Sequence, residues 1–171
     1  MMNGKGAVYV ATGRPYVEEA LRSAASLKAQ MPGLPLTLFT DQGTESPLFE
    51  RVVPIGDPLG SSKDKIAYLR RSPYERTLYL DTDTHVCGDL ADLFHLLDRF
   101  DIAAAHSPNR RVSRSGDIPA SFPEYQAGVI LFRRSPAVEG FLSSWLAAYE
   151  ESSRHAAGRV YDQPAFRELL Y

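Results

Sequence analysis

Asp81 and Asp83 stand one residue apart, directly after the apolar run 78–80. Residues i and i+2 of an extended strand point to the same side, so both carboxylates can face one ion. Two close carboxylates repel each other and favour a cation between them. Mg²⁺ and Mn²⁺ accept one or two carboxylates and fill their other positions with water and phosphate oxygens. The pair therefore predicts a divalent-metal site for a phosphate-bearing ligand, with a turn or a helix cap as the structural alternative.

Other polar residues surround this pair in the sequence. Lys63 and Lys65 lie on an expected helix before it and suit a nucleotide phosphate, although a solvated helix face would carry the same residues. Asp89 and Asp92 follow it, and we expect them to cap and begin the next helix, where the helix dipole favours acids. His85 lies close enough to approach an ion, but an exposed turn residue is the favoured interpretation. The remaining histidines, His95, His106 and His155, show no ligand spacing.

The composition sets limits on the class of protein. The chain has 171 residues, 44% of them hydrophobic, which suits one domain with a single core. Its 19 basic and 21 acidic residues lack the basic excess of a nucleic-acid binder. Cys87 is the only cysteine, so no disulfide is expected, and a cytoplasmic location is predicted. The apolar run 7–11 is too short for a signal peptide or a transmembrane segment.

A dense basic patch, Arg110, Arg111 and Arg114, lies among serines and a glycine. This composition indicates an exposed loop. Two interpretations stay open for it: a solvated loop, or a mobile lid near a phosphate-bearing ligand.

Apolar runs and helical stripes alternate along the chain, which indicates an α/β fold with helices layered on a sheet. The run 7–11 (AVYVA) is typical of a buried parallel strand. Pro15 suits a first helical turn, and Ser135 followed by proline is a helix cap, as Asp162 is for the last helix. The expected strands are 7–11, 35–40, 51–55, 76–80, 101–105 and 128–132, and the expected helices are 16–30, 63–71, 89–97, 136–149 and 162–171.

The segment 62–94, SKDKIAYLRRSPYERTLYLDTDTHVCGDLADLF, resembles the D-x-D region of the GT-A glycosyltransferases. It is most similar to glycosyltransferase family eight, the group of glycogenin and bacterial galactosyltransferases. That family combines an early A-T-x-x-x-Y segment, a YLDxDxxVxxDLxxLF segment, an N-x-G-V segment and a D-Q pair that opens a helix. The chain has its landmarks in the same order: Ala11-Thr12 with Tyr16, Asp81-Thr82-Asp83, Gln126-Ala127-Gly128-Val129 and Asp162-Gln163.

The resemblance implies a GT-A (Rossmann-like), three-layer α/β/α fold with a mostly parallel central sheet, formed by a single domain over 1–171. It also implies retention of anomeric configuration, with a front-face transfer assisted by the leaving phosphate. Asp162 would then orient the sugar or stabilise positive charge at its anomeric carbon. The nucleotide would be bound by Ala11, Thr12, Tyr16, Asp41, Lys65, Asp81 and Thr82, the metal by Asp81 and Asp83, and the donor sugar by Gln126, Asp162 and Gln163.

Two departures from the family pattern affect these expectations. The family usually has asparagine where Gln126 stands, and the extra methylene would move the amide by roughly one bond length. Family members also carry a histidine as third metal ligand after the D-Q helix, and the sequence ends before such a segment. Either the domain is truncated at its C-terminus, or water and phosphate complete the metal shell, or the metal binds weakly.

The function expected from these residues is metal-dependent transfer of a sugar from a nucleotide-diphosphate sugar, a UDP-sugar, to an unknown acceptor. That acceptor could be a sugar, a lipid or a protein. Two alternatives remain. One is a non-catalytic nucleotide-sugar-binding module, favoured by the missing third ligand and by Gln126. The other is a phosphatase of the haloacid dehalogenase type, because residues 81–84 (DTDT), which follow an apolar strand, are similar to the D-x-D-x-T motif of that class.

Overall fold

The computed structural model describes residues 3–60, 62–107, 118–156, 158 and 160–171. Its strands are β1 Asn3–Ala11, β2 Leu36–Thr40, β3 Arg51–Pro54, β4 Tyr74–Leu80, β5 Ile102–His106 and β6 Tyr125–Arg133. Its helices are α1 Arg14–Gln30, α2 Ser62–Leu69, the 3₁₀ helix η1 Ala91–Asp98, α3 Pro136–His155 and α4 Gln163–Leu170. The basic patch predicted at Arg110, Arg111 and Arg114 lies outside the described residues.

The six strands form one sheet in the order β3-β2-β1-β4-β6-β5. β1, β2, β3 and β4 run parallel to one another, and β6 is antiparallel to both β4 and β5. The predicted mostly parallel sheet is therefore confirmed. The chain passes from β1 to β2 and β3 on one side and then returns to place β4 on the other side of β1. Ligands of such sheets bind at this reversal, outside the carboxyl ends of the strands.

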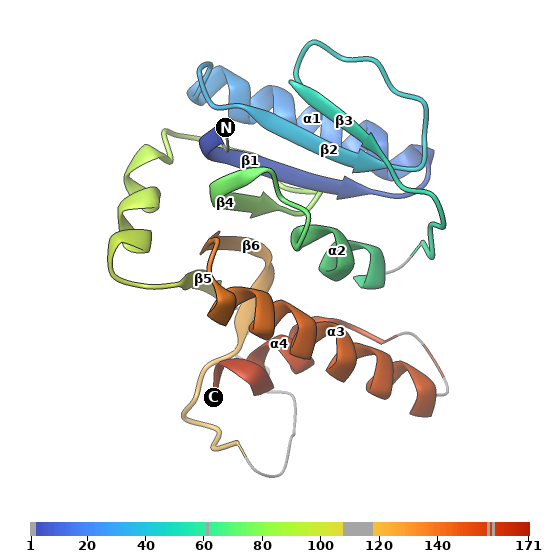
Figure 1. Ribbon diagram of the computed structural model, residues 1–171, viewed down its shortest axis with the longest axis vertical. Helices are drawn as coiled ribbons and strands as arrows, with labels where there is room; N and C mark the ends of the chain where they lie inside the picture. Colours follow the sequence, from blue (N-terminus) through green and yellow to red (C-terminus); the bar gives the residue numbers. More distant parts are fainter. Residues whose placement is uncertain (1–2, 61, 108–117, 157, 159) are drawn as a thin grey trace.

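Helices cover both faces of the sheet, which gives the predicted three layers. One core cluster joins α1 and η1 to the sheet, and the second joins α2, α3 and α4 to the opposite face. In Figure 1, α1 lies with β1 to β3 at the top, and α3 and α4 lie at the bottom. No helix of the described ranges is long and apolar enough to cross a membrane.

Local sequence explains the start of the first βα unit. β1 carries a run of buried residues, from Gly6 to Ala11. Gly13 then adopts φ +91°, a left-handed conformation that other residues rarely reach, and Pro15 falls in the first turn of α1. The buried residues of α1 include Val17, Ala20, Ala24 and Leu27, spaced as one apolar stripe.

The structure corrects several expected boundaries. Segment 89–97 is not an α-helix: η1 is a 3₁₀ helix, and its buried Phe94 and Leu97 are three residues apart, the repeat of that helix. β6 begins three residues before the expected Gly128. α3 continues to His155, because Glu151 pairs with Arg154 and His155 within the last turn. β1 begins at Asn3, four residues before the expected Ala7, where it pairs with the start of β4. Shifts of one or two residues occur at the ends of α1, α2, α4 and four strands, β2 to β5.

The predicted helix caps differ in outcome. Ser135 caps α3, accepting a hydrogen bond from the backbone N–H of Val138 at 3.2 Å. Asp162 occupies the N-cap position of α4, but its side chain makes no capping hydrogen bond. It turns instead towards α2, as described below. Asp89 lies before η1 and accepts a hydrogen bond from the N–H of Ala91 at 2.8 Å.

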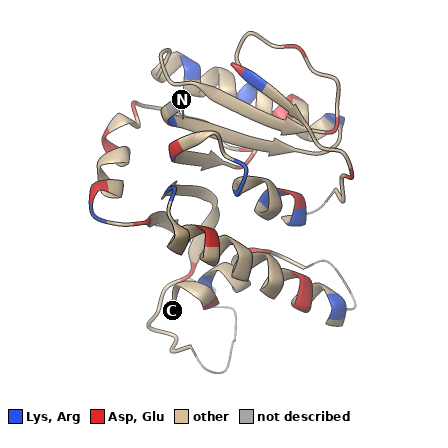
Figure 2. Cartoon of the chain, viewed as in Figure 1, with Lys and Arg blue, Asp and Glu red and all other residues tan. Residues whose placement is uncertain are grey.

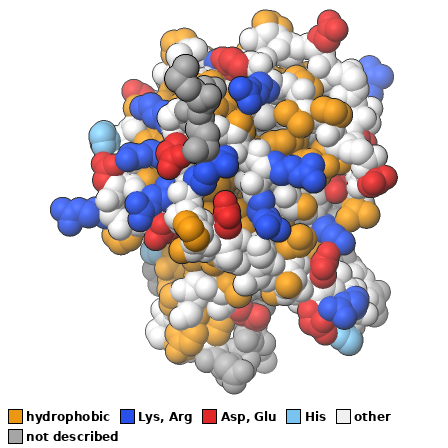
Figure 3. Space-filling model, in the orientation of Figure 1, with side chains coloured by type: hydrophobic (Ala, Val, Ile, Leu, Met, Phe, Trp, Pro, Cys, Tyr) orange, Lys and Arg blue, Asp and Glu red, His pale blue; other side chains and the backbone are white. Residues whose placement is uncertain are grey.

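Charged residues avoid the middle of the sheet and gather on the helices and at the strand starts (Figure 2). The register places Lys5 beside Arg76 and Arg76 beside Arg133, all at the edge where the parallel strands begin. Lys and Arg side chains also spread across the face shown in Figure 3. The carboxyl edge of the sheet, where β1 and β4 end, has a very different character.

Candidate functional site

A cavity of about 610 Å³ lies where β1 and β4 end. It is lined from four parts of the chain that are far apart in sequence: the end of β1 with the start of α1, the segment from just before α2 to the turn after β4, Glu124 just before β6, and the segment leading into α4. The sheet topology brings these parts together, because β1 and β4 are neighbours and α4 packs below β6.

The turn after β4 is fastened to α1. The Asp81 carbonyl accepts hydrogen bonds from the N–H of Thr84 at 3.2 Å and from its hydroxyl at 2.8 Å. The Thr84 hydroxyl also forms a 2.7 Å hydrogen bond with the Ser23 hydroxyl, which in turn forms a 3.0 Å hydrogen bond with the Tyr9 hydroxyl. Burial raises the pKa of Tyr9 to about 12, against a smaller lowering by its bond to Ser23, so this network stays neutral at ordinary pH. One turn further along α1, Ser26 accepts the N–H of Val86 at 2.9 Å.

The Asp81 carboxylate is held by three neighbours. Its Oδ1 accepts a 2.5 Å hydrogen bond from the Tyr79 hydroxyl and lies 3.2 Å from the Lys65 Nζ. Its Oδ2 lies over Gly128, where an added Cβ would approach it to 2.7 Å. Gly128 therefore leaves the space that this carboxylate occupies. Burial, and then the negative charge of Asp81, keep the pKa of Tyr79 well above its usual range, so that its hydroxyl remains a donor.

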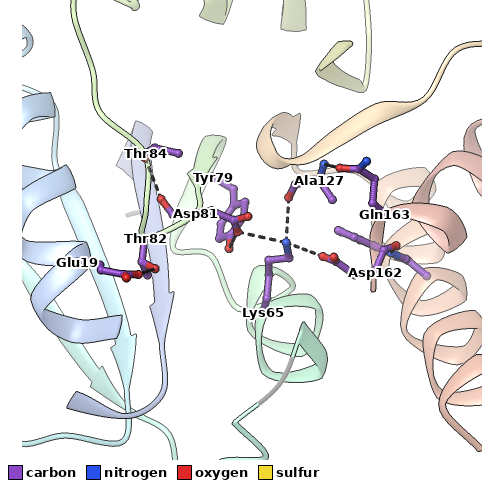
Figure 4. Close-up of polar contacts among 10 residues, drawn as sticks. Glu19, Lys65, Tyr79, Asp81, Thr82, Thr84, Ala127, Asp162 and Gln163 are labelled. Atoms are coloured by element: carbon purple, nitrogen blue, oxygen red, sulfur yellow. Dashed lines mark hydrogen bonds and ion pairs between the residues drawn. The ribbon is translucent and has the colours of Figure 1, made fainter. Parts of the chain in front are cut away.

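Lys65 bridges two segments that are 81 residues apart (Figure 4). Its side chain is 10% exposed, and its Nζ lies 2.5 Å from Asp162 Oδ2 and 3.2 Å from Asp81 Oδ1. It also donates to the Ala127 carbonyl at 3.1 Å. Burial works to lower the pKa of Lys65, but the two carboxylates outweigh it and hold the pKa above its usual value. The ammonium is therefore a fixed positive charge in the cavity.

The other end of the cavity is organised around α4. The Trp145 indole N–H donates to the Asp162 carbonyl at 3.0 Å, which anchors the start of α4 to α3. Gln163 is held at both ends of its amide: Oε1 accepts the N–H of Ala127 at 3.4 Å, and Nε2 donates to Glu124 at 2.6 Å. Buried Arg167 donates to the carbonyls of Pro119 and Phe122, just before β6.

The β1–α1 end of the cavity carries Thr12, Tyr16 and Glu19. The Glu19 carboxylate accepts a 2.8 Å hydrogen bond from the Thr82 hydroxyl, linking α1 to the residue between the two predicted metal ligands. Asp41 stabilises the β1–α1 connection, because its carboxylate accepts a 2.8 Å hydrogen bond from the N–H of Gly13. Burial would raise the pKa of Asp41, but this bond and others outweigh it and lower the pKa below its usual value.

Eight of the predicted site residues line the cavity together. They are Thr12, Tyr16, Lys65, Asp81, Thr82, Asp83, Asp162 and Gln163. Four others lie elsewhere among the described residues: Ala11 is buried in β1, Asp41 stands behind Gly13, Lys63 pairs with Glu150 of α3 at 2.6 Å, and Gln126 is half-buried in β6. Their predicted contacts with nucleotide and sugar stay predictions.

Among the cavity residues that reasoning from sequence missed are Glu19, Tyr79, Glu124 and Tyr161. Glu19 and Glu124 were ordinary polar positions in a helix and a strand approach, with nothing beside them in sequence to suggest a site. Tyr79 fits the pattern of a buried strand residue, although its place two residues before Asp81 directs both side chains to the same side. Tyr161 directly precedes the Asp162-Gln163 pair, which was the available signal, and the structure leaves it 62% exposed.

The described residues supply a limited set of metal ligands. No group of three or more His, Cys, Asp or Glu side chains within them is arranged to hold an ion. His95 and His155 pair with Asp98 and Glu151 on their own helices, and His106 packs against the Tyr125 ring. The donors that fit a hard divalent cation are the Asp81 and Asp83 carboxylates, with water and phosphate oxygens needed for the rest of its shell.

Searches for related sequences and structures gave different results. No family model and no curated protein matched the sequence. Solved structures did match. The glycosyltransferase GlyE of Streptococcus pneumoniae TIGR4 aligns with 98% of this chain at 22% identity and a TM-score of 0.68. The galactosyltransferase LgtC, in complex with donor and acceptor sugar analogues, aligns with 96% at 17% identity and a TM-score of 0.63. The bifunctional glycosyltransferase WbbM aligns with 100% at 15% identity and a TM-score of 0.67.

The chain has the fold of the GT-A glycosyltransferases. This confirms the predicted fold class, and the haloacid dehalogenase alternative loses its support. The chain spans 44% of GlyE, 70% of LgtC and 38% of WbbM. In terms of the GT-A fold, the cavity lies at the reversal of strand order beside β1, where this class of sheet binds its ligands.

Proposed function

We propose that this chain is a glycosyltransferase domain of the family-eight type. It holds a nucleotide-diphosphate sugar, a UDP-sugar, in the cavity where β1 and β4 end, and transfers the sugar to a hydroxyl group of an acceptor. The observation that carries the proposal is the meeting of Asp81, Asp83, Lys65 and the Asp162-Gln163 pair in one cavity of a GT-A fold. A cytoplasmic location is part of the proposal, supported by the single, exposed, unpaired Cys87.

The charge of the cavity supports the need for a divalent cation. Among its described lining residues, Lys65 is the only base, whereas five carboxylates face the same space: Glu19, Asp81, Asp83, Glu124 and Asp162. A diphosphate adds further negative charge, which one ammonium that already serves two carboxylates does not balance. Asp81 and Asp83 would hold Mn²⁺ or Mg²⁺, which would neutralise the diphosphate and make it a better leaving group.

The residues of the chain would then divide the work along the donor. Thr12 and Tyr16 line the end that would take the nucleoside, and Lys65 stands where the diphosphate would meet Asp81. Asp162 and Gln163 flank the sugar. In the transfer, the bond from the anomeric carbon to the phosphate oxygen breaks as the bond to the acceptor oxygen forms. The acceptor proton passes to the leaving phosphate on the same face, which preserves the anomeric configuration.

The first experiment titrates the protein with UDP in the presence and absence of Mn²⁺, by calorimetry and by thermal shift. We expect binding that requires the metal. Asp83→Asn should weaken metal-dependent UDP binding at least about tenfold and leave the melting temperature nearly unchanged, because Asp83 is exposed. The matched control is Asp92→Asn, an exposed carboxylate on η1 that lies away from the cavity. Equal UDP affinities for Asp83→Asn and the unchanged protein would contradict the proposal.

A non-catalytic binding module is the second candidate. It is favoured by the absence of a three-ligand metal group among the described residues and by the engagement of Asp162 with Lys65. Release of free sugar or its transfer from a UDP-sugar separates the two. A module binds UDP with the metal and turns nothing over, whereas a transferase slowly hydrolyses its donor even without an acceptor.

A further inference from the structure

Glu124 is a buried carboxylate at the α4 end of the cavity. The residue is 8% exposed, yet it is among those that line the cavity. It directly precedes β6, and its backbone carbonyl accepts the N–H of Ser107 at 2.7 Å, which fixes the backbone at this point. A carboxylate in such a place requires hydrogen-bond donors, because burial of an unpaired charge is unfavourable.

Among the described residues, the amide of Gln163 donates to this carboxylate. Its Nε2 donates to Glu124 Oε1 at 2.6 Å, while its Oε1 faces the N–H of Ala127. A backbone N–H can only donate and a carboxylate can only accept, so these two partners together fix which end of the amide faces which neighbour. Glu124 therefore sets the orientation of Gln163, a residue next to Asp162.

Glu124 retains capacity to accept further hydrogen bonds. An ionised carboxylate offers about four lone-pair positions, and Gln163 uses one of them. The basic side chain of the cavity, Lys65, is engaged away from Glu124, because its two ion pairs are with Asp81 and Asp162. The partners that suit the remaining capacity are the hydroxyl groups of a ligand in the cavity. A negatively charged ligand group in this place would be repelled by the carboxylates of both Glu124 and Asp162.

We propose that Glu124 determines which donor sugar the cavity accepts: it orients Gln163, accepts a hydrogen bond from a sugar hydroxyl, and excludes a sugar that carries a carboxylate. The inference rests on the proposed function and deepens it, since it assigns the donor to the neutral hexoses and rules out the uronic acids. Discrimination arises from an unfavourable contact as well as a favourable one.

The test compares affinities for UDP, UDP-glucose, UDP-galactose and UDP-glucuronate, all with Mn²⁺, in the unchanged protein and three variants. Glu124→Gln keeps the size and an oxygen that can accept from Gln163 but removes the charge. Glu124→Asp keeps the charge on a shorter side chain, and Glu124→Leu removes both. Melting temperature and circular dichroism confirm that each variant is folded. UDP itself lacks the sugar, so its affinity reports on the nucleotide end alone.

We expect the unchanged protein to bind one neutral UDP-hexose more tightly than UDP-glucuronate. Glu124→Gln should reduce that preference about tenfold, and Glu124→Asp should retain most of it. Glu124→Leu should also lose the extra affinity of the UDP-hexose relative to UDP. The affinity for UDP itself should stay within about twofold in all variants. An unchanged preference in Glu124→Gln, with UDP still bound, overturns this inference alone. Absence of UDP binding by the unchanged protein overturns the proposed function and the inference with it.

Discussion

At the scale of single residues, Asp81 shows how a carboxylate is placed before any ligand arrives. Tyr79 and Lys65 hold its Oδ1, its backbone N–H donates to the Gly128 carbonyl at 2.8 Å, and the missing side chain of Gly128 accommodates Oδ2. The family pattern identified Gly128 as part of a motif. The structure adds a reason for glycine there, since a Cβ would clash with the carboxylate of Asp81, the residue that directly follows the neighbouring strand β4.

Gly128→Ala should displace Asp81. The added Cβ would lie 2.7 Å from Oδ2 and 3.2 Å from Cγ, so the carboxylate must shift from the position in which Tyr79 and Lys65 hold it. We expect metal-dependent UDP affinity to fall about tenfold or more, and the free energy of unfolding to fall by about 1–3 kcal/mol.

Gly140→Ala provides the matched control in calorimetry and urea unfolding. Its Cβ meets nothing within 4 Å, and it lies inside α3, where alanine should stabilise the helix by up to about 1 kcal/mol. Full retention of metal-dependent UDP binding by Gly128→Ala would show that Asp81 does not need its present position.

At the scale of elements, α1 does more than cover one face of the sheet. Its Ser23 and Ser26 lie one turn apart and hold the turn after β4 at Thr84 and Val86. The direction of β6 matters equally: because it runs antiparallel to β4, its first residues reach the carboxyl edge of the parallel strands. This reversal brings Glu124 and Ala127 to the same edge as Asp81.

Ser23→Ala should separate α1 from this turn. It removes a hydroxyl that is 1% exposed and leaves the Tyr9 and Thr84 hydroxyls without that partner. We expect a loss of about 1–3 kcal/mol in the free energy of unfolding, measured by urea denaturation. Ser152→Ala, an exposed serine that donates only to the Ala148 carbonyl, should change it by less than about 0.5 kcal/mol. Equal effects of the two substitutions would contradict the role given to Ser23.

At the scale of the whole molecule, the two edges of the sheet differ in charge. At the strand starts, Arg76 pairs with Asp98 and Arg133 with Asp101, whereas the cavity at the carboxyl edge is acidic. Ion pairs on the outside join distant segments: Glu50 accepts the Leu36 N–H at 2.6 Å and pairs with Lys28 at 2.7 Å, linking β2 to α1. Such carboxylates connect stability to pH.

The protein should lose stability in acid. Burial would raise the pKa of Glu50, but its bonds to Leu36 and Lys28 outweigh this and hold the pKa below its usual value. A lowered folded-state pKa contributes stability that is present above the unfolded value, about 4.3 for Glu, and is lost as pH falls through the folded one. Urea midpoints from pH 7 to pH 3 should therefore fall, and the fall should be shallower for Glu50→Gln. An identical pH profile for that variant would contradict the assignment.

Much of this arrangement could be predicted from sequence, and the limits have physical causes. The parallel strands were recognisable because strands buried on both faces appear as continuous apolar runs in the sequence. The Asp81–Asp83 pair was recognisable because its two residues are close together in the sequence. The direction of β6 was not, since its apolar run 128–132 would suit either orientation of a buried strand. Glu19 and Glu124 escaped notice because their partners, Thr82 and Gln163, are brought to them only by the folded chain.

The bridge made by Lys65 has one consequence for recognition. A free lysine side chain has about 2 kcal/mol of rotamer entropy to lose when it is immobilised. Here two carboxylates and a carbonyl have already immobilised it, so that loss falls on folding. An anion that enters the cavity therefore finds the ammonium group already in position, and its binding does not carry most of the entropy cost of ordering this side chain.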